Sequence, residues 1–553
     1  MHSYTTHIHS DGAYYKRNCH HNTTITGDDA VNHHQPTNMT PLQHRTMDTL
    51  TTDHHFIVIA ADKNAGGCCL RRDLYIKKAC SDHLSNIEVY QRITYDTAFR
   101  TNLSLRYRIR SFLGNFRNIM SKAEVDYFQR FNCDKRFPTN KFARFRMTIK
   151  VHKGPSVPYT YRPIVCCAGT FMNCLSKWVD HHLQKLKIFV PSYIKDSGAL
   201  LDHLKSIHRL PYNARLFLAD ARSMYTNINT THALQVIGNW LDNLQSTGKL
   251  RAAGLPFFPI EAIKEALKLV MENNIFEFGD MYFKQLTGTA MGTSAACLWA
   301  TIYFAIHEDF LLEKYKDDIL LYKRFIDDMF GIWIGSNLHY AQFQVDTDNF
   351  GSLRWDFEPL GPEKNFLDLT ISIGRHGEIL TRTYQKPINL YQYLPPHSAH
   401  APHIMKGVVY SLLRQYKRQN TLESDYIKQA KLLFQRLVAR GWDPNVIKQY
   451  TLQADTRLRS TERNPPQIVE PPLTNKELAI LHWTFHPNDI SSKLIRRLYD
   501  VHCKATFTRT LGIQQFTIAL HAAPNISSVV TRAKLIQEHG KEASKYFDGE
   551  PDP

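Results

Sequence analysis

Three aspartates stand where strand-like segments end, and their spacing suggests metal-dependent chemistry. The segment "KRFIDDMFGIWI", residues 323–334, carries Asp327 and Asp328 side by side between two apolar, β-prone runs. In "RLFLADARSMYTNI", residues 215–228, an apolar run ends at Asp220. Adjacent carboxylates repel one another, and burial makes this worse unless a cation lies beside them. The sequence therefore predicts a hairpin turn with two acids beside a strand that ends in a third.

The chemistry that such a cluster supports is phosphoryl transfer with divalent metals. Magnesium prefers oxygen ligands and typically takes one or two carboxylates together with substrate phosphates. Two metals about 3.5–4 Å apart stabilise the attacking and the leaving oxygen of an in-line displacement. We therefore predict that Asp220, Asp327 and Asp328 are catalytic residues and ligands of two Mg²⁺ ions, with Mn²⁺ as an alternative. The other interpretation of the Asp-Asp pair is an ordinary polar turn, where Asp is common.

A glycine-rich segment leads into an uncharged stretch. In "QLTGTAMGTS", residues 285–294, Gln285, Gly288 and Gly292 would let the backbone approach a flat ligand such as a base pair, although glycines also make plain tight turns. The uncharged stretch 285–306 has the length of a membrane span. Its first half is rich in Gly, Thr and Ser, so we expect a loop that runs into a buried helix and no membrane insertion.

Basic residues dominate the charge of this 553-residue chain. Lysine and arginine number 68 against 51 acids, which gives a net charge of +17 and favours a polyanionic partner over a merely solvated surface. Lys150 and Lys153 in "RMTIKVHKGP" and Arg162 in "YRPIV" lie upstream of the acids and suit contacts with triphosphate or template phosphates. The length allows three to four lobes of roughly 150 residues.

Cysteine usage and the N-terminal segment bear on the compartment. The ten cysteines include no CxxC pair, which indicates a reduced, intracellular protein. Residues 1–55 are polar and rich in His, Thr and Asn, with no apolar signal core. This composition predicts disorder.

The remaining pattern predicts strands first and helices later. Residues 56–64 read as a strand with a polar turn, 260–273 as a helix, and 365–387 as strands around a turn at "RHGE". A helix begins near Ser424 and should stop at Gly441. The proline-rich segment "NPPQIVEPPLTN" is predicted to be a linker or a surface arm.

An amphipathic helix is expected soon after residue 400, in "IMKGVVYSLLRQYKRQ". Apolar residues recur on one face and basic residues on the other. The basic face provides the candidate nucleic-acid contacts Arg414, Lys417 and Arg418.

Taken in order, these segments resemble a reverse transcriptase, and more narrowly the Penelope-like retroelement family, relatives of the telomerase catalytic subunit. "RPIV" resembles the fingers motif, "LADARSMYTNI" motif A, "TGTAMGTS" motif B, "FIDDMF" motif C and "NFLDLTI" motif D. "TRTYQKPINLYQYLP" is similar to the primer grip, "VIAADKNAGGCCL" to an upstream family block, and "PHSAHAPHIMKGVVYSLLRQ" to the segment entering the thumb. The resemblance covers roughly residues 56–540.

The resemblance implies roles for individual residues. Asp220 and Asp327 would be the main metal ligands, and Asp328 would complete the carboxylate cluster. Tyr225 would lie under the sugar and exclude a 2′-hydroxyl. The remaining implied contacts are Arg162 with the incoming triphosphate, Gln285 and Gly288 with the template or nucleotide, and Lys386 with the primer end.

The implied fold is α/β in the α+β sense, arranged as a right-hand polymerase. Residues 1–55 would be a disordered segment, 56–200 mixed fingers, and 201–395 a palm built on an antiparallel sheet. A helical thumb would cover 396–545 and a short tail 546–553.

The implied activity is that of an RNA-directed DNA polymerase acting on an RNA template, a DNA primer and dNTPs. The chain departs from the family in three ways: no GIY-YIG endonuclease motif is recognisable, Gln385 stands where Arg is frequent, and "VHKGP" inverts the usual Lys-Pro-Gly. We therefore expect an endonuclease-lacking member or a truncated copy, which would depend on a separate endonuclease or a chromosome-end primer. An element that copies itself at a chromosome would work in the nucleus.

Two other functions remain open on the sequence. One is a catalytically inert nucleic-acid-binding remnant of such an element. The other is a different metal-dependent phosphoryl-transfer enzyme, such as a nuclease. Metal-dependent primer extension separates the first from the polymerase, and cleavage without dNTPs would indicate the second.

Overall fold

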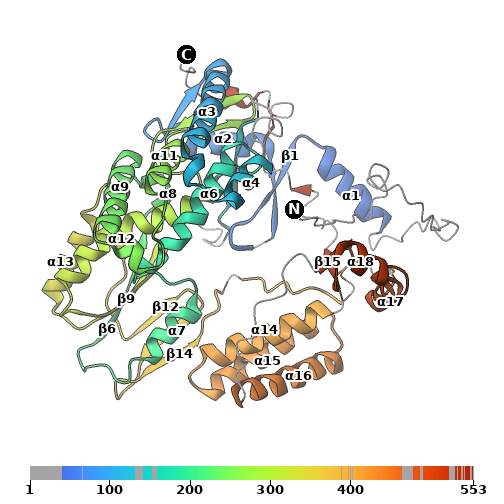
Figure 1. Ribbon diagram of the computed structural model, residues 1–553. Coiled ribbons are helices and arrows are strands. Elements are labelled where there is room, and N and C mark those ends of the chain that lie inside the picture. Colours follow the sequence, from blue (N-terminus) through green and yellow to red (C-terminus); the bar gives the residue numbers. More distant parts are fainter. Residues whose placement is uncertain are drawn as a thin grey trace. The chain divides into compact units, whose positions relative to one another are not determined.

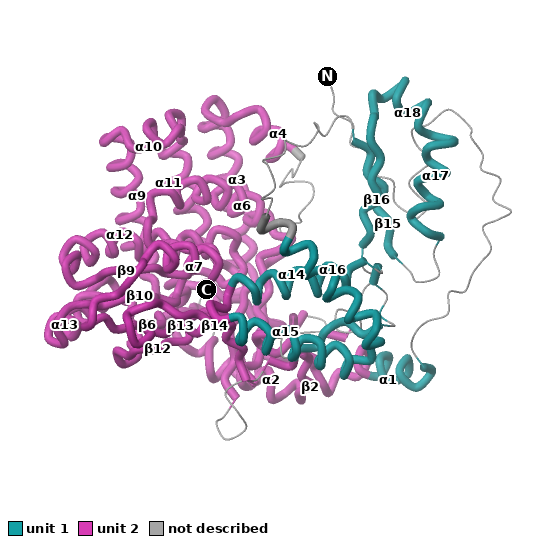
Figure 2. The backbone as a smooth tube through the Cα atoms, turned by 90° about the horizontal axis from the view of Figure 1, so that it is seen from below, with its two compact units in different colours: residues 1–49, 391–418, 423–529 teal, residues 50–390, 419–422, 530–553 magenta. Residues whose placement is uncertain are grey.

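The computed structural model describes most of the chain, in two units that are treated separately below. The described residues are 40–64, 66–130, 141–151, 159–387, 389–396, 398, 400–401, 403–463, 478–485, 490–521, 530–531, 534–536, 540, 542–547 and 551. Unit 1 comprises residues 1–49, 391–418 and 423–529, and unit 2 comprises residues 50–390, 419–422 and 530–553 (Figure 2). Lys153, residues 464–475 and most of the predicted disordered segment 1–55 lie outside the described residues.

A four-stranded antiparallel sheet in unit 2 carries all three aspartates. Its strand order is β11 (Trp355–Phe357), β6 (Arg215–Ala221), β10 (Asp328–Trp333) and β9 (Ile319–Phe325). The strands β9 and β10 form the predicted hairpin, and β6 is the predicted strand that ends near Asp220. The central strands β6 and β10 are almost wholly buried, which explains their near-continuous apolar sequence.

The two faces of this sheet enter different apolar clusters because side chains alternate along a strand. On β6, Phe217 and Ala219 belong to the cluster that contains the helices, while Leu216 and Leu218 belong to a second cluster. The helical side includes α9 (Thr230–Ser246), α12 (Ala296–Lys314) and α13 (Asn337–Asp348) (Figure 1). The other side includes α7 (Ser197–Lys205), β12 (Glu363–Phe366) and β13 (Leu369–Ile373), and β13 also pairs with β14 (Ile379–Thr383). Asp220 lies on the same face of β6 as Leu216 and Leu218.

A five-stranded sheet crosses the predicted boundary at residue 200. Its order is β3 (Tyr90–Ile93), β8 (Met281–Gln285), β7 (Ile275–Phe278), β4 (Ala143–Ile149) and β5 (Tyr161–Cys166). Strands β7 and β8 come from the range predicted to be palm, yet they pair with strands of the range predicted to be fingers. Phe145, Phe276 and Phe283 make its buried centre.

Helices pack beside both sheets of unit 2. The elements concerned are α3 (Tyr95–Phe116), α4 (Lys122–Arg130), α6 (Met172–Lys185), α10 (Lys249–Ala252) and α11 (Ile260–Met271). Helix α11 confirms the predicted helix at 260–273. Helix α12 confirms the predicted loop-to-buried-helix transition, since Trp299, Tyr303 and Phe304 are fully buried. Among the described residues, no helix has both the length and the apolar character needed to cross a membrane.

Unit 1 contains a helical segment and a strand pair. The helices are α14 (His403–Gln419), α15 (Glu423–Ala439) and α16 (Pro444–Arg463), followed by β15 (Leu478–Thr484), α17 (Ser492–His502), α18 (Lys504–Leu511) and β16 (Gln515–His521). Met405, Val409 and Leu413 are buried, which confirms the amphipathic reading of α14. The parallel pairing of β15 with β16 was not expected, since the whole range was predicted to be helical.

One helix also forms where the sequence predicted disorder. Helix α1 (Pro41–Thr52) begins after Thr40, whose hydroxyl accepts a hydrogen bond from Gln43 N while Gln43 Oε1 accepts one from Thr40 N. This reciprocal pair is a capping box, which stabilises a helix start without any buried face. The predicted fold class is confirmed: the described chain is mixed α/β, and antiparallel strands carry the aspartates.

Candidate active site

Strand register brings two of the predicted catalytic acids directly opposite one another. Asp328 on β10 pairs with Asp220 on β6, and Asp356 on β11 pairs with Asp220 from the other side. Directly opposite residues of an antiparallel pair have Cβ atoms about 4.5–5.5 Å apart, so their carboxylates repel one another. Asp356 was missed by sequence reasoning because its strand is only three residues long and shows no periodicity.

A strained turn presents the third acid. Phe325 pairs with Asp328, which leaves Ile326 and Asp327 as a two-residue turn. Ile326 has a φ of 56°, a left-handed conformation that is costly for a β-branched residue. Arg324 Nη1 donates to the Ile326 carbonyl at 2.7 Å, and Ala221 N donates to the Asp327 carbonyl at 2.9 Å. These hydrogen bonds hold the turn to β9 through Arg324 and to β6 through Ala221.

Arg324 holds this turn from within a buried ion pair. Its Nε lies 2.5 Å from Glu308 Oε1 on α12, and both side chains are almost fully buried. Tyr322 donates to Glu308 Oε1 at 2.7 Å and Ser192 donates to Glu308 Oε2 at 2.5 Å. Arg324 Nη2 also donates to the Thr301 carbonyl at 2.8 Å. With its charge and hydrogen bonds satisfied, this pair links the hairpin rigidly to α12.

The carboxylates of the cluster repel one another, and burial together with this repulsion raises the pKa of Asp328 and of Asp220. Burial, then the charges of Asp327 and Asp220, raise the pKa of Asp328 to about 6. Burial, then Asp327 and Asp356, raise the pKa of Asp220. Asp220 is exposed, while Asp327 and Asp328 are half-buried.

Cations from three segments approach this acidic cluster. Lys63 and Lys386 lower the pKa of Asp328, and Lys63 and Lys150 lower that of Asp220. Lys386 follows β14, and Lys150 follows β4. The structure therefore places Lys150 and Lys386 close enough to act on the acids, and their contacts with triphosphate, template or primer stay predictions.

Lys63 and Asp62 are site residues that sequence reasoning missed. Strand β1 (Phe56–Ala60) pairs with β2 (Gly67–Arg71), and the bridge between Ala61 and Ile149 places the β1 end next to the β4 end. Asp62 Oδ2 lies 3.4 Å from Arg162 Nη2. Lys63 has a φ of 57°, and partial burial followed by Lys386 lowers its pKa. The local signal, a strand that ends in charged residues, does not place these residues beside the acids.

Tyr225 lies near the acids, on the four-residue helix α8 (Met224–Asn227). Its hydroxyl is 3.3 Å from Cys297 Sγ. Burial, then the contact with Cys297, raises the pKa of Tyr225, and the charges of Asp327 and Arg162 also act on it. The tyrosine is therefore neutral and half-buried beside the predicted metal ligands.

Gly288 supports the Tyr225 turn through the backbone. Gly288 N donates to the Ile228 carbonyl at 2.8 Å, and Thr289 N donates to the Tyr225 carbonyl at 2.7 Å. A side chain at position 288, where φ is +76°, would collide with the backbone of Tyr225 and Thr226. The close approach that the glycine-rich segment predicted is thus made to this turn, and a contact of Gly288 with a nucleotide stays a prediction.

Gln285 is buried at the end of β8, with only 3% of its surface exposed. Its Nε2 donates to the Thr287 carbonyl at 2.9 Å, within the same glycine-rich loop. In this structure Gln285 shapes that loop, and its predicted contact with the nucleotide or template stays a prediction.

The basic face of α14 belongs to unit 1, whereas the aspartates belong to unit 2. Arg414 and Arg418 are exposed there, and Lys417 lies 2.6 Å from Glu423 Oε2 and stacks over Tyr426. Their contact with nucleic acid stays a prediction.

The donor set fits a hard divalent cation. Asp220, Asp327 and Asp328 offer only oxygen ligands, and burial followed by the charges of Asp327 and Asp220 raises the pKa of Asp328, which a bound cation would lower again. Within the described residues, no group of three His, Cys, Asp or Glu side chains is arranged to hold a metal by itself. Magnesium commonly takes one or two carboxylates and completes its shell with substrate phosphates and water.

Comparisons with known proteins give three results. The pattern of the animal helix-turn-helix domain family matches residues 392–451, most of which belong to unit 1. No curated protein matches the chain. Telomerase from Candida albicans in complex with a telomeric RNA fragment is similar with a TM-score of 0.47 and 10% identity, covering 75% of this chain and 69% of that one.

Two further solved structures show weaker similarity. Apo telomerase from Candida tropicalis has a TM-score of 0.41 and 10% identity, covering 75% of this chain and 67% of that one. The Sicinivirus 3Dpol RNA-dependent RNA polymerase has a TM-score of 0.36 and 10% identity, covering 60% of this chain and 70% of that one.

Proposed function

We propose that this chain is an RNA-directed DNA polymerase of a Penelope-like retroelement, working in the nucleus with two Mg²⁺ ions. One observation carries the proposal: the register of β6 and β10 sets Asp220 opposite Asp328, and a fixed turn adds Asp327. An acidic cluster flanked by Lys63, Lys150, Arg162 and Lys386 suits a substrate that brings both phosphates and metal ions.

The reaction would join a primer 3′-hydroxyl to a dNTP. The oxygen attacks the α-phosphorus, the bond to the bridging oxygen breaks, and pyrophosphate leaves. Bound metals would supply charge stabilisation at the attacking and leaving oxygens. The three aspartates would hold them.

The surrounding residues of the chain would orient the substrates. Lys63, Lys150 and Arg162 would bind the triphosphate, with Asp62 positioning the Arg162 guanidinium. Lys386 would lie near the primer end. Positioning and electrostatics provide most of the catalysis in phosphoryl transfer.

Sugar choice would depend on Tyr225. The Cys297 contact and the Thr289 hydrogen bond hold this residue next to the acids. A ring in that place would collide with a ribose 2′-hydroxyl, which favours deoxynucleotides. The RNA template and DNA primer follow from the family resemblance and the net positive charge.

The test is extension of a DNA primer on an RNA template with Mg²⁺ and all four dNTPs. We expect template-directed products that disappear when EDTA removes the metal or when dNTPs are replaced by rNTPs. A DNA template of the same sequence serves as the comparison arm. Cleavage of the nucleic acid without dNTPs would instead indicate a nuclease, and binding without extension would indicate an inert remnant.

A further inference from the structure

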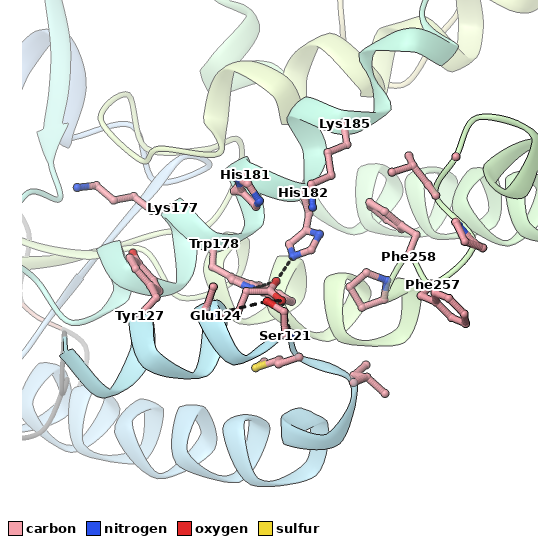
Figure 3. Close-up of a pocket in the computed structure, with 17 residues that line it drawn as sticks. Ser121, Glu124, Tyr127, Lys177, Trp178, His181, His182, Lys185, Phe257 and Phe258 are labelled. Carbon is pink, nitrogen blue, oxygen red and sulfur yellow. Dashed lines mark hydrogen bonds and ion pairs between the residues drawn. The ribbon is translucent and has the colours of Figure 1, made fainter. Parts of the chain in front are cut away.

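A pocket in unit 2 is lined by none of the predicted catalytic residues. It has a volume of about 750 Å³, within the range of ligand sites. Its walls come from the segment 119–127, from α6 and from residues 254–259 that precede α11. In Figure 3, α6 lies above the pocket and α4 below it, and Phe257 and Phe258 lie to the right.

The floor of this pocket is rigid and polar. Glu124 accepts hydrogen bonds from Ser121 N and Oγ at 2.8 and 2.6 Å, from Trp178 Nε1 at 2.8 Å and from His182 Nε2 at 2.6 Å. Burial opposes ionisation of Glu124, but these bonds, those from Ser121 first, lower its pKa to about 2. The carboxylate is fully occupied by protein donors and leaves little capacity for a ligand.

His182 has one buried ring nitrogen without a hydrogen-bond partner among the described residues. Burial lowers the pKa of His182 to about 4, so the ring is neutral at pH 7 and Nε2 donates to Glu124. Nδ1 is then an acceptor, and it has no hydrogen-bond partner among the described residues. Only 4% of His182 is exposed, so its ring is part of the packed wall of the pocket.

The rim is basic along one side. Lys177, His181 and Lys185 are spaced four residues apart, so they share one face of α6. Lys177 is exposed and Lys185 is half-buried, and neither belongs to an ion pair of the described residues. They lie about 12 Å apart along the helix axis, a span of a few nucleotides.

The other side of the rim is aromatic. Phe257 is 94% exposed, although a large apolar side chain gains stability by being covered. Phe258 lies beside it and is half-buried, as is Tyr127, which lies on the side of Lys177 (Figure 3). An exposed ring and two half-buried rings near lysines are a combination that binds unpaired bases and their phosphates.

We propose that this pocket binds unpaired nucleotides of a single-stranded nucleic acid, with bases against Phe257 and Tyr127 and phosphates along Lys177 and Lys185. The site is separate from the acidic cluster and does not require catalysis.

The test is fluorescence anisotropy with a labelled, unstructured 15-nucleotide oligo(U) RNA and an oligo(dT) DNA of equal length. We expect Phe257→Ala to weaken binding about 5- to 10-fold, as loss of a stacked base does. The double variant Lys177→Gln, Lys185→Gln should reduce the slope of log K against log salt by about 1.4, since each single-strand phosphate contact contributes about 0.7. Stronger binding of RNA than DNA would show that a 2′-hydroxyl is recognised, and equal binding would show base and phosphate contacts alone.

Matched controls separate this site from general binding and from the acidic cluster. Tyr212→Ala removes another exposed aromatic residue, and Lys195→Gln with Lys205→Gln removes two exposed lysines that do not line the pocket. These controls should leave affinity and salt slope unchanged. The proposal is overturned if the pocket variants bind both oligonucleotides as the wild type does. It is also overturned if a 4-thiouridine RNA cross-links elsewhere and not to the peptide that contains Phe257.

Discussion

At the scale of single residues, the candidate site is defined by charges that approach one another from distant parts of the chain. The three aspartates could be singled out from the sequence because Asp220 and the Asp327–Asp328 pair each lie at the end of a strand-like run. Lys63 and Asp356 could not be assigned, since their place beside the acids depends on the Ala61–Ile149 bridge and on the register of β11. Such long-range pairings leave no local pattern.

Lys63 gives the first prediction at this scale. Lys63→Ala should lower kcat/KM for dNTPs about 10- to 100-fold, because a charge-assisted contact with the triphosphate is lost. The exposed Lys77 lies on the neighbouring helix α2 (Arg72–Ala79) and provides the control, Lys77→Ala. Steady-state primer extension measures both. Equal values for Lys63→Ala and wild type would remove Lys63 from the site.

Tyr225 gives the second prediction at the scale of single residues. Tyr225→Ala should reduce discrimination against ribonucleotides about 10- to 100-fold, because the ring no longer fills the space of a 2′-hydroxyl. Tyr225→Phe keeps the ring and loses only the contact with Cys297, so it should keep the selectivity. The readout is the ratio of dNTP to rNTP incorporation. Unchanged discrimination in the alanine variant would exclude this residue as the sugar filter.

At the scale of elements, the hairpin β9–β10 depends on the buried ion pair behind it. Glu308→Gln leaves the buried Arg324 charge without a counter-charge, and breaking a buried pair costs about 3–5 kcal/mol. We expect faster amide exchange of residues 319–333, measured by hydrogen–deuterium exchange. Glu313→Gln, in the exposed pair with Lys316, is the matched control. Similar exchange in both variants would show that the ion pair does not hold the turn.

The hydrogen bond between Glu124 on α4 and His182 on α6 gives a prediction about pH dependence. His182 has its pKa lowered by burial from 6.5 to about 4, so between these values the unfolded chain binds a proton that the folded chain does not. The free energy of unfolding should therefore fall as pH falls from 6.5 towards 4.5, above the range where Glu124 titrates. His182→Gln should show a smaller fall in the thermal midpoint over this range. An identical pH dependence in the two proteins would contradict the assignment.

At the scale of the whole molecule, sequence pattern predicted element types better than their partners. The Asp-Asp hairpin, the strand before Asp220 and the helices at 260–273 and 424–441 follow from local periodicity and agree with the structure. The pairing of β7 and β8 with strands before residue 200 joins segments that are far apart in the sequence, and no local sequence pattern predicts it. The parallel pairing of β15 with β16 could not be predicted for the same reason.

The most direct test of the central claim compares Asp327→Asn with wild type in single-turnover primer extension on an RNA template. The account predicts a rate at least about 1,000-fold lower, because loss of a metal-binding carboxylate removes several kcal/mol of charge stabilisation, with binding of the primer–template nearly unchanged. Asp317→Asn, an exposed acid outside the cluster, should extend normally. Near-normal extension by Asp327→Asn would contradict the assignment of Asp220, Asp327 and Asp328 as the metal-binding site.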